Sequence, residues 1–219
     1  MKVVLLPLKD PAQAKQRLAG RLSTKERQQL AWAMLEDVAQ ALRQAREPDQ
    51  VVVVSSCPPI LSYAERNHWR VIPESHQISE SHSVDHSCQL LLESGVKTVL
   101  RIPGDIPLLQ GQDLDQLLSH EMQPPSAILV PSRDGTGTNA LLRNPPDAFP
   151  SHFGHNSLIL HQREARQQGV ELKIIHNPRI SFDLDELDDI LSFRELDQDT
   201  HTSAALEKFD SLKGLSEIK

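Results

Sequence analysis

Three stretches decide the fold: "KVVLLPL" (residues 2–8), "STKERQQLAWAMLEDVAQALRQARE" (residues 23–47) and "QVVVVSS" (residues 50–56). The two short runs are continuous and rich in β-branched residues, as expected for strands buried on both faces of a sheet. The long run predicts a helix, because Ser23 and Glu26 form a capping box and apolar residues recur every four positions after it. A strand, a helix and a second strand in this order are typical of an α/β protein.

Five more short apolar runs are typical of strands: "WRVI" (69–72), "KTVLRI" (97–102), "SAILVPS" (126–132), "NALLR" (139–143) and "ELKIIH" (171–176). Helical patterns lie among them: "VDHSCQLLLESG" (84–95), "SLILHQREARQQG" (157–169) and "DLDELDDILSFREL" (183–196). The alternation predicts an α/β fold with a mixed, mostly parallel sheet flanked by helices. Ligands of such sheets bind beyond the carboxyl ends of the strands, so the loops that follow strands should carry the function.

The length of 219 residues suits one domain with an ordinary core. Patterning weakens after about Leu196, so we place the domain at residues 1–195 and expect residues 196–219 to form a loose helix or tail. The sequence does not fix the oligomeric state, and a homodimer is compatible with a small α/β enzyme.

The composition excludes several classes of protein. A net charge of −7 argues against a nucleic-acid partner, which would require a basic face. Cys57 and Cys88 are far apart and lack metal-ligand spacing, which disfavours a disulfide framework or a zinc site and suits a reducing cytoplasm. The first apolar run is too short for a signal peptide and no later run could span a bilayer, so we expect a cytoplasmic protein with no membrane partner.

The segment after the first strand is locally basic. Within thirteen residues it holds Lys9, Lys15, Arg17 and Arg21. Such a cluster on an acidic protein suits phosphate groups, and we expect Lys9, Lys15 and Arg17 to contact a nucleotide. A solvated loop is the alternative. The chain contains neither GxxxxGK[ST] nor GxGxxG, so a P-loop or dinucleotide-binding fold is not indicated.

Two acidic sites follow strands or extended segments. Asp105, in "IPGDIPLL", lies just past a predicted strand, and Asp183 and Asp185, in "SFDLDELDDI", are two positions apart. Carboxylate oxygens suit Mg²⁺, and side chains at i and i+2 of an extended segment share one face. The alternative for Asp105 is a turn or helix cap, but Asp113 is better placed for that role.

The stretch "SRDGTGTNALL" (residues 132–142) has more glycines and hydroxyls than a hairpin requires. Thr136 and Thr138 offer hydroxyl donors, while Gly135 and Gly137 expose backbone N–H groups. These groups could cradle a small phosphorylated acid. A wide glycine hairpin is the alternative of equal weight.

The segment "FPSHFGHNSLILH" (residues 149–161) follows shortly afterwards. Gly154 would let the backbone approach a ligand, and Asn156 and Ser157 stand at a predicted helix N-terminus, where N–H groups favour an anion. Simple N-capping by Asn156 or Ser157 explains the pattern equally well. A metal site at His82 and His86 is less favoured, because their stretch reads as a polar helix entry without HExxH.

Four motifs occur in order: "LPLKDPAQAKQRLAGRLSTKERQQLAWAMLEDV", "IPGDIPLL", "RDGTGTNALL" with "PPDAFPSHFGHNSL", and "SFDLDELDDI". Over roughly residues 1–195 the chain resembles the guanylyltransferase family of deazaflavin coenzyme F(420) biosynthesis, whose members include 2-phospho-L-lactate and phosphoenolpyruvate guanylyltransferases. The resemblance implies a single-domain, GT-A-like nucleotidyltransferase fold. It also implies that GTP reacts with a phosphorylated three-carbon acid and that pyrophosphate is released.

The resemblance also implies roles for individual residues. By position, Thr138, Gly154 and Ser157 match the family's phospho-acid-binding residues, and Asp105, Asp183 and Asp185 match its Mg²⁺ ligands. Lys15 and Arg17 match the basic loop that meets GTP phosphates, so Asp105, Lys15 and Arg17 are the expected catalytic residues.

One segment departs from the family. Where the family has a Gly-Leu-Asn loop, this chain reads "ISESHSVDHSC", so we expect an altered loop at Ser79–Cys88. The strictness of guanine preference and the choice among 2-phospho-L-lactate, phosphoenolpyruvate and 3-phosphoglycerate stay open. A sugar-phosphate nucleotidyltransferase and a catalytically silent nucleotide-binding regulator are the alternative functions.

Overall fold

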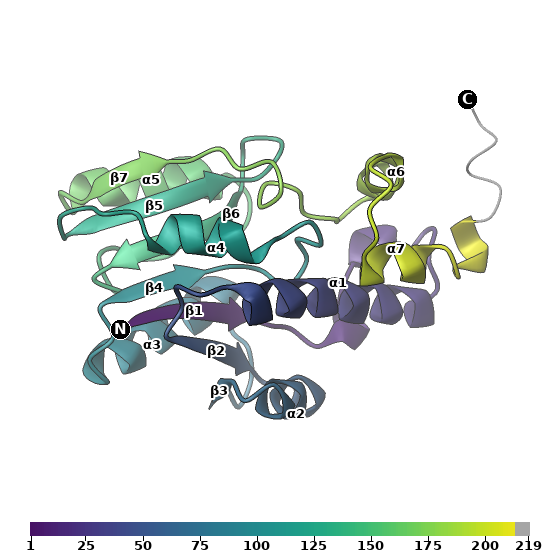
Figure 1. Cartoon of the computed structure of the whole chain (residues 1–219), viewed down its shortest axis with the longest axis horizontal. Helices are drawn as coiled ribbons and strands as arrows, with labels where there is room; N and C mark the ends of the chain where they lie inside the picture. Colours follow the sequence, from purple (N-terminus) through teal and green to yellow (C-terminus); the bar gives the residue numbers. More distant parts are fainter. Residues whose placement is uncertain (213–219) are drawn as a thin grey trace.

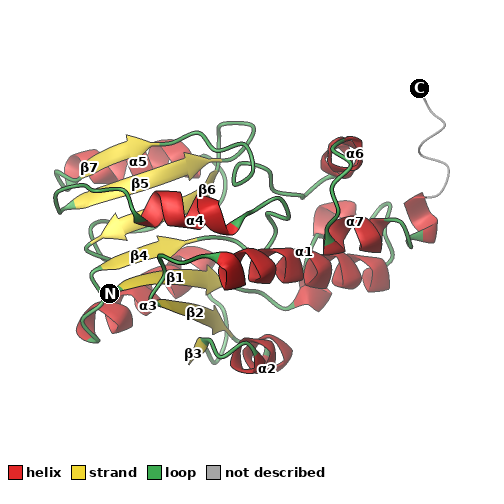
Figure 2. Cartoon of the chain, in the orientation of Figure 1, coloured by secondary structure: helices red, strands yellow, loops and turns green. Residues whose placement is uncertain are grey.

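The computed structural model describes residues 1–212, and its centre is a seven-stranded sheet (Figures 1 and 2). The strands are β1 (Lys2–Pro7), β2 (Gln50–Ser55), β3 (Arg70–Pro73), β4 (Thr98–Arg101), β5 (Ser126–Pro131), β6 (Thr138–Asn144) and β7 (Glu171–Ile174). Their order across the sheet is β3-β2-β1-β4-β6-β5-β7. All seven correspond to the apolar runs in the sequence, which confirms the α/β prediction.

The direction of β6 determines which loops meet. β6 pairs antiparallel with both β4 and β5, whereas the other paired strands run parallel. The amino end of β6 therefore lies at the edge where β1, β4 and β5 have their carboxyl ends. The loops after β1, after β4 and before β6 consequently converge at this edge of the sheet.

Helices cover both faces of the sheet (Figure 1). They are α1 (Thr24–Gln44), α2 (Pro58–Arg66), α3 (Glu80–Glu93), α4 (Gly111–Leu118), α5 (Ser157–Gln167), α6 (Leu187–Glu195) and α7 (His201–Leu206). The alternation of side chains along β1 separates two apolar layers. Val4 and Leu6 pack with residues of α1, α2 and α4, while Val3 and Leu5 pack with residues of α3. Burying each such side chain contributes about 1.5–3 kcal/mol.

Helix α1 belongs to two apolar clusters. It starts at the expected capping box, in which Glu26 N–H donates to Ser23 Oγ at 3.2 Å and Ser23 N–H donates to Glu26 at 2.8 Å. Val38, in its second half, packs on the sheet, whereas Leu30 and Met34 pack beside the C-terminal elements. The helix thus joins the sheet to the part of the chain that follows β7.

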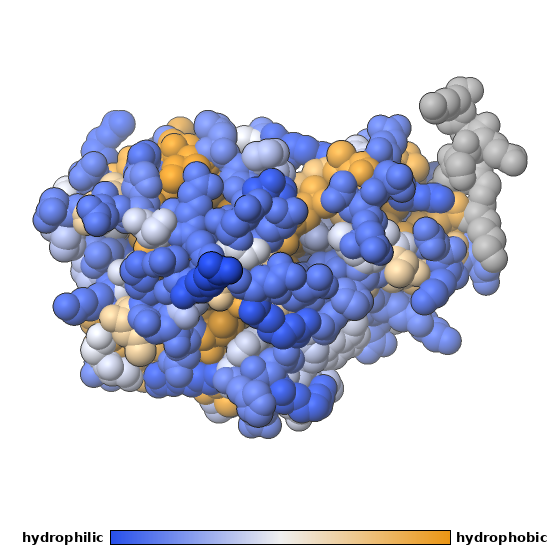
Figure 3. All heavy atoms as spheres, viewed as in Figure 1, coloured by the Kyte–Doolittle hydropathy of each residue, from blue (hydrophilic) through white to orange (hydrophobic). Residues whose placement is uncertain are grey.

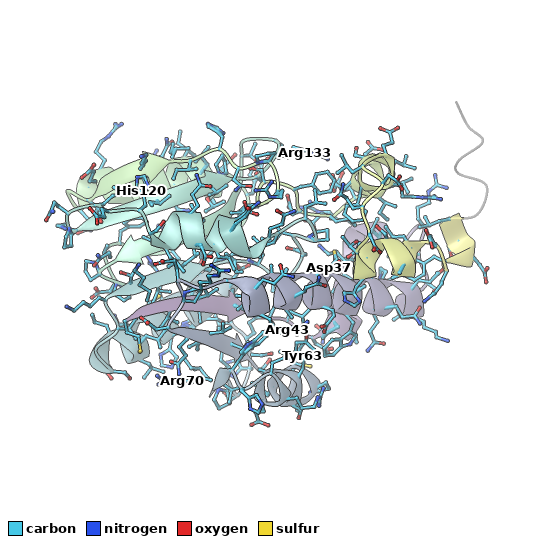
Figure 4. All side chains as sticks on the ribbon, in the orientation of Figure 1. Asp37, Arg43, Tyr63, Arg70, His120 and Arg133 are labelled. Carbon is cyan, nitrogen blue, oxygen red and sulfur yellow. The ribbon has the colours of Figure 1, made fainter. Side chains whose placement is uncertain are left out.

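The C-terminal elements dock on α1 rather than trailing from the domain (Figure 4). The Asp37 carboxylate, on α1, accepts hydrogen bonds from the backbone of His201 and Thr202 at 2.7 and 3.0 Å. Leu206 and Leu212 are buried in the same cluster as Leu30. Of the expected helix or tail at residues 196–219, the described part is therefore a packed helix with a short 3-10 turn, and residues 213–219 lie outside the described residues.

Two helices differ from the expectations. Helix α2 was not predicted; its Pro58 and Pro59 occupy the first helical positions, where no N–H is needed. The expected loop at Ser79–Cys88 is wrong, since α3 already starts at Glu80. Ser79 caps this helix by accepting a hydrogen bond from His82 N–H at 3.1 Å.

The face that carries α1 and α4 is covered mainly by hydrophilic residues (Figure 3). Within residues 1–212, no helix has the length and apolar character needed to cross a bilayer.

Candidate active site

Two neighbouring cavities open at the edge where the loops converge. The first, the glycine-loop cavity, has a volume of about 620 Å³ and is lined by the stretch before β6, the start of α5 and the segment before α6. The second, the basic-loop cavity, has a volume of about 280 Å³ and is lined by the loop after β1 and one face of α1. Both are lined by Glu80, Arg101, Pro103, Asp105 and Asp185, so these residues form the wall between them.

Lys15, which lines the basic-loop cavity, contacts two residues of this wall. Its Nζ donates to Asp105 Oδ2 and to Asp185 Oδ1, each at 2.6 Å. Only 5% of the Lys15 side chain is exposed. Burial alone would lower the pKa of Lys15, but the charges of Asp105 and Asp185 overcome it and raise the pKa above its usual value. Lys15 therefore stays charged and ties the basic loop to two of the predicted metal ligands.

Asp183 lies against the same pair of carboxylates. Its Oδ1 accepts a hydrogen bond from Asn139 Nδ2, the second residue of β6, at 3.1 Å. Burial raises the pKa of Asp183, and the negative charges of Asp105 and Asp185 raise it further despite that hydrogen bond. The structure thus places the three predicted carboxylates near one another. No positively charged side chain is among the groups that shift the pKa of Asp183.

The arrangement fits a magnesium ion that shares its ligands with a substrate. Among residues 1–212, no group of three or more His, Cys, Asp or Glu side chains is placed to hold a metal by itself. Mg²⁺ usually binds through one or two carboxylates, waters and substrate phosphates. Asp183 and Asp105 could supply the protein oxygens, since their mutual repulsion is what a divalent cation would relieve.

The glycine-loop cavity is strongly acidic for a site that would take anions. Seven carboxylates line it: Glu80, Asp105, Asp134, Asp183, Asp185, Glu186 and Asp189. Three guanidinium groups line it: Arg17, Arg101 and Arg133. Phosphate groups would be repelled here unless further positive charge accompanied them.

The stretch "SRDGTGT" forms a closed loop around one carboxylate. Asp134 accepts hydrogen bonds from Ser132 Oγ at 2.6 Å, Thr136 N at 2.9 Å and Thr136 Oγ1 at 2.8 Å. The bond from Ser132, followed by those from Thr136, lowers the pKa of Asp134 to about 2. The Thr136 hydroxyl is therefore directed to Asp134, and of the two threonines only Thr138 has its hydroxyl available to a ligand.

Arg133 anchors the glycine loop to the C-terminal half of the site (Figure 4). Its guanidinium group contacts Asp189 of α6 and lies 4.6 Å from the centroid of the Phe182 ring. Gly137 has a steric requirement, because a Cβ there would lie 2.7 Å from Ser132 Oγ.

The three predicted acid-binding residues line the same cavity. Thr138 is the first residue of β6, and Ser157 is the first residue of α5. Gly154 has a φ of +117°, a backbone conformation that residues other than glycine rarely adopt. Asn156 adopts a left-handed backbone and makes no side-chain cap, so capping by Asn156 does not explain this segment.

The remaining cations of the basic loop differ in position. Lys9 lines the basic-loop cavity. Arg17 is 69% exposed at its side chain and lies 3.6 Å from Asp185 Oδ2 and 3.4 Å from Glu186 Oε1. Arg21 is exposed and lines neither cavity. The rings of His82 and His86 lie 6.2 Å apart on α3 and form no larger metal-binding group within the described residues.

Sequence reasoning missed one ion pair in the wall between the cavities. The guanidinium group of Arg101 contacts the Glu80 carboxylate and lies 4.1 Å from the centroid of the Phe153 ring. Arg101 Nη1 also donates to the carbonyls of Thr138 and Asn139 at 3.2 and 3.1 Å. The sequence did contain an indication of this ion pair. An arginine lies inside the apolar run "KTVLRI", and a charge in a buried strand needs a partner.

Comparisons with known proteins identify relatives of this chain. The sequence matches the family described as "Guanylyl transferase CofC like" over residues 1–212. It is 35% identical over 196 residues to a phosphoenolpyruvate guanylyltransferase of Conexibacter woesei, which covers 88% of this chain and 86% of that protein. It is 30% identical over 187 residues to a 3-phospho-D-glycerate guanylyltransferase of Colwellia psychrerythraea, covering 85% and 88% respectively.

Solved structures share the fold at low sequence identity. A Desulfovibrio desulfuricans protein assigned as a nucleotide-diphospho-sugar transferase superposes with a TM-score of 0.79 at 16% identity, with 96% of each chain covered. A nucleotidyl transferase from Methanothermobacter thermautotrophicus superposes with a TM-score of 0.65 at 14% identity, covering 90% of this chain and 97% of that one.

The fold and the site together define a nucleotidyltransferase. Within that class, the chain belongs to the CofC-like guanylyl transferase family.

Proposed function

We propose that this protein transfers GMP from GTP to the phosphate of a phosphorylated three-carbon acid and releases pyrophosphate, as a step in the biosynthesis of coenzyme F(420). Phosphoenolpyruvate, 2-phospho-L-lactate and 3-phosphoglycerate are the candidate acids. The observation that carries the proposal is the meeting of the two cavities at Lys15, Asp105 and Asp185. Such a wall suits a reaction between two bound anions.

Each reactant has a cavity of matching character. The basic-loop cavity combines Lys9 and Lys15 with apolar side chains such as Met34 and Ile60, which suits a triphosphate and a base. The glycine-loop cavity offers the Thr138 and Ser157 hydroxyls and the backbone at Gly154, which suits a small phosphorylated acid. The attacking and leaving groups would then lie on opposite sides of the α-phosphorus.

The chemistry is an in-line displacement. An oxygen of the acid's phosphate forms a bond to the α-phosphorus of GTP, and the bond from that phosphorus to the bridging oxygen of pyrophosphate breaks. Lys15 stabilises negative charge on the triphosphate. Arg17, which lines the glycine-loop cavity, contributes positive charge on the side of the acid, and the hydroxyls of Thr138 and Ser157 hold the acid in line. Mg²⁺ held by Asp105 and Asp183, together with substrate phosphates, would supply electrostatic stabilisation of both phosphate groups.

The test is a panel of pyrophosphate-release assays. Each nucleoside triphosphate is paired with each of the three acids and, separately, with a sugar 1-phosphate, all in the presence of Mg²⁺. We expect release with GTP and at least one acid. Release only with the sugar phosphate would favour a sugar-phosphate nucleotidyltransferase, and no release with any pair would favour a silent nucleotide-binding regulator.

A matched pair of variants ties the activity to the site. Asp105→Asn should reduce turnover by about 10²-fold or more, because it removes a carboxylate charge that would hold Mg²⁺ and that holds Lys15 where the two phosphates meet. Glu121→Gln changes an exposed carboxylate outside both cavities and should leave turnover unchanged. Near-normal turnover of Asp105→Asn would contradict the role of this carboxylate.

A further inference from the structure

A histidine is buried directly behind the glycine-loop cavity. His161, on the second turn of α5, has no exposed surface. Its ring meets the Phe153 ring edge-on at a centroid distance of 5.1 Å and lies 6.2 Å from the Phe149 ring. The ring is therefore fixed in orientation by its packing.

The partners of the two ring nitrogens assign the position of the proton. The backbone N–H of His152 donates to His161 Nε2 at 2.8 Å, so Nε2 must carry a lone pair. A neutral imidazole with an accepting Nε2 carries its proton on Nδ1. Nδ1 lies 3.0 Å from Thr138 Oγ1, and it therefore donates to that hydroxyl.

The His161 ring stays neutral near neutral pH. A charged imidazole would present two N–H groups, one of them directed at the His152 N–H. Burial, together with the charges of Arg143, His152 and Arg101, lowers the pKa of His161 to about 3. The ring accordingly stays neutral, with a single tautomer that satisfies both neighbours.

This tautomer constrains the Thr138 hydroxyl. Within residues 1–212, His161 is the only hydrogen-bond partner that the hydroxyl has, and Thr138 lines the glycine-loop cavity. Because its oxygen already accepts from His161, its own proton is left to point away from the ring. The bond from His161 occupies one lone pair of the oxygen and leaves the hydroxyl proton free to be donated into the cavity, which is the polarity that an oxyanion requires.

We propose that His161 is a positioning residue that holds the Thr138 hydroxyl as a hydrogen-bond donor to an oxyanion of the acid substrate. The part of this inference that concerns the acid rests on the proposed function. The part that concerns the hydrogen-bond polarity rests on the structure alone. His161 is the last residue of the segment "FPSHFGHNSLILH", but it was not among the predicted site residues.

Two substitutions separate positioning from structural support. The glutamine side chain can place its carbonyl oxygen where Nε2 lies in the histidine. His161→Gln therefore keeps an acceptor for the His152 N–H but loses the N–H that donates to Thr138. His161→Asn keeps a donor at the reach of Nδ1 but leaves the His152 N–H without a partner. Because a buried N–H without a partner destabilises the fold, the Asn variant should be the less stable of the two.

The two readouts should therefore rank the variants in opposite order. His161→Gln should raise KM for the acid by about tenfold, as expected when a hydrogen bond to a charged group is lost, with KM for GTP unchanged. His161→Asn should stay within about threefold of the wild type for the acid while melting at the lower temperature. The same ranking in both readouts would show a merely structural role and overturn the inference.

A double variant tests whether His161 acts through Thr138. In a Thr138→Val background, His161→Gln should produce no further rise in KM for the acid, because the hydroxyl that it orients is already gone. Independent, multiplicative effects would overturn the inference.

A spectroscopic measurement judges the inference even if no acid is turned over. Nitrogen-15 spectra of the histidine rings in the intact protein should show His161 protonated at Nδ1 and not at Nε2. Protonation at Nε2 overturns the inference whatever the kinetics. If His161 is protonated at Nδ1 but no acid reacts or binds, the proposed function has failed, and the donor role toward the acid is overturned with it.

Discussion

Lys15 Nζ lies 2.6 Å from Asp105 Oδ2, although the two residues are 90 positions apart in the chain. This contact fixes the loop after β1 against the end of β4 and places a charged ammonium group where the two cavities meet. The Lys15 ammonium group contacts both Asp105 and Asp185, which the sequence had assigned to a metal ion alone. The positive charge beside these carboxylates would therefore come from Lys15 and from any metal ion that binds with the substrates.

Replacing Lys15 should affect turnover more than folding. We expect Lys15→Met to lower kcat/KM for GTP by about 10²- to 10³-fold, because the positive charge between Asp105 and Asp185, at the proposed triphosphate site, is lost. The free energy of unfolding should fall by only about 1 kcal/mol or less, because the partner carboxylates are 32% and 37% exposed. Steady-state kinetics and urea unfolding measure the two quantities.

The control for this variant is Arg21→Met, which removes an exposed cation of the same loop that lines neither cavity. It should match the wild type in both measurements. Equal losses of kcat/KM in the two variants would show that the loop acts through its overall charge.

Asp183→Asn should raise stability and abolish activity. The raised pKa of Asp183 means that its charged form opposes folding near neutral pH, so a neutral amide should increase the melting temperature. The retained Oδ1 can still accept from Asn139. Turnover should fall by about 10²-fold or more, and the Mg²⁺ concentration for half-maximal rate should rise. A lower melting temperature would contradict the proposed repulsion among the three aspartates.

The Asp113 carboxylate should make stability depend on acid pH. Its side chain is fully buried and accepts hydrogen bonds from Asn177 Nδ2 and Arg179 Nε at 2.8 Å each. Burial would raise the pKa of Asp113, but the bonds from Arg179 and Asn177 outweigh it and hold the pKa below 3.8. The stabilisation is therefore complete above the unfolded value and disappears as the pH falls through the lower folded value.

Asp113→Asn should accordingly cost about 1.5 kcal/mol of unfolding free energy at pH 7, because it weakens the hydrogen bonds from Arg179, whose side chain is 37% exposed and can be solvated. The difference from the wild type should shrink as the pH is lowered below 3.8. Urea unfolding across this pH range measures it, with Glu121→Gln as the exposed-carboxylate control. A difference that stays constant with pH would count against the ion pair.

The Glu80–Arg101 pair should show strong coupling in a double-mutant cycle. Glu80→Leu leaves the 7%-exposed Arg101 side chain without its charge partner and should cost about 3 kcal/mol. In Glu80→Leu/Arg101→Leu the buried charge is gone, so the loss should be smaller than the sum of the single losses. Additive losses, measured by urea unfolding, would show that the two side chains do not stabilise each other.

The local patterns of the sequence predicted the elements better than their mutual contacts. The seven apolar runs and the capping box at Ser23 depend on neighbouring residues, and the structure has them where expected. The gathering of Asp105, Asp183 and Thr138 followed from the rule that ligands bind beyond strand ends. The proximity of these residues was therefore accessible without coordinates.

Contacts between distant segments were not accessible in the same way. The reversal of β6, the bridge from Lys15 to Asp185 and the pairing of Glu80 with Arg101 each join segments that no local pattern connects. The use of the Thr136 hydroxyl by Asp134 was also missed, because a carboxylate two positions away serves a loop as readily as a ligand does.

The placement of Leu18 and Leu22 has a consequence for synthesis of the protein. Leu18 lies within the basic segment and Leu22 directly after it, and both share a cluster with Phe182, Phe193 and Leu206, which are encoded near the other end of the chain. A chain leaving the ribosome exposes its first segment long before those apolar partners exist. We therefore expect the segment that carries Lys15 to be packed in place only in the last stage of translation, so that a nascent chain stalled before Phe182 would contain the sheet without this packing.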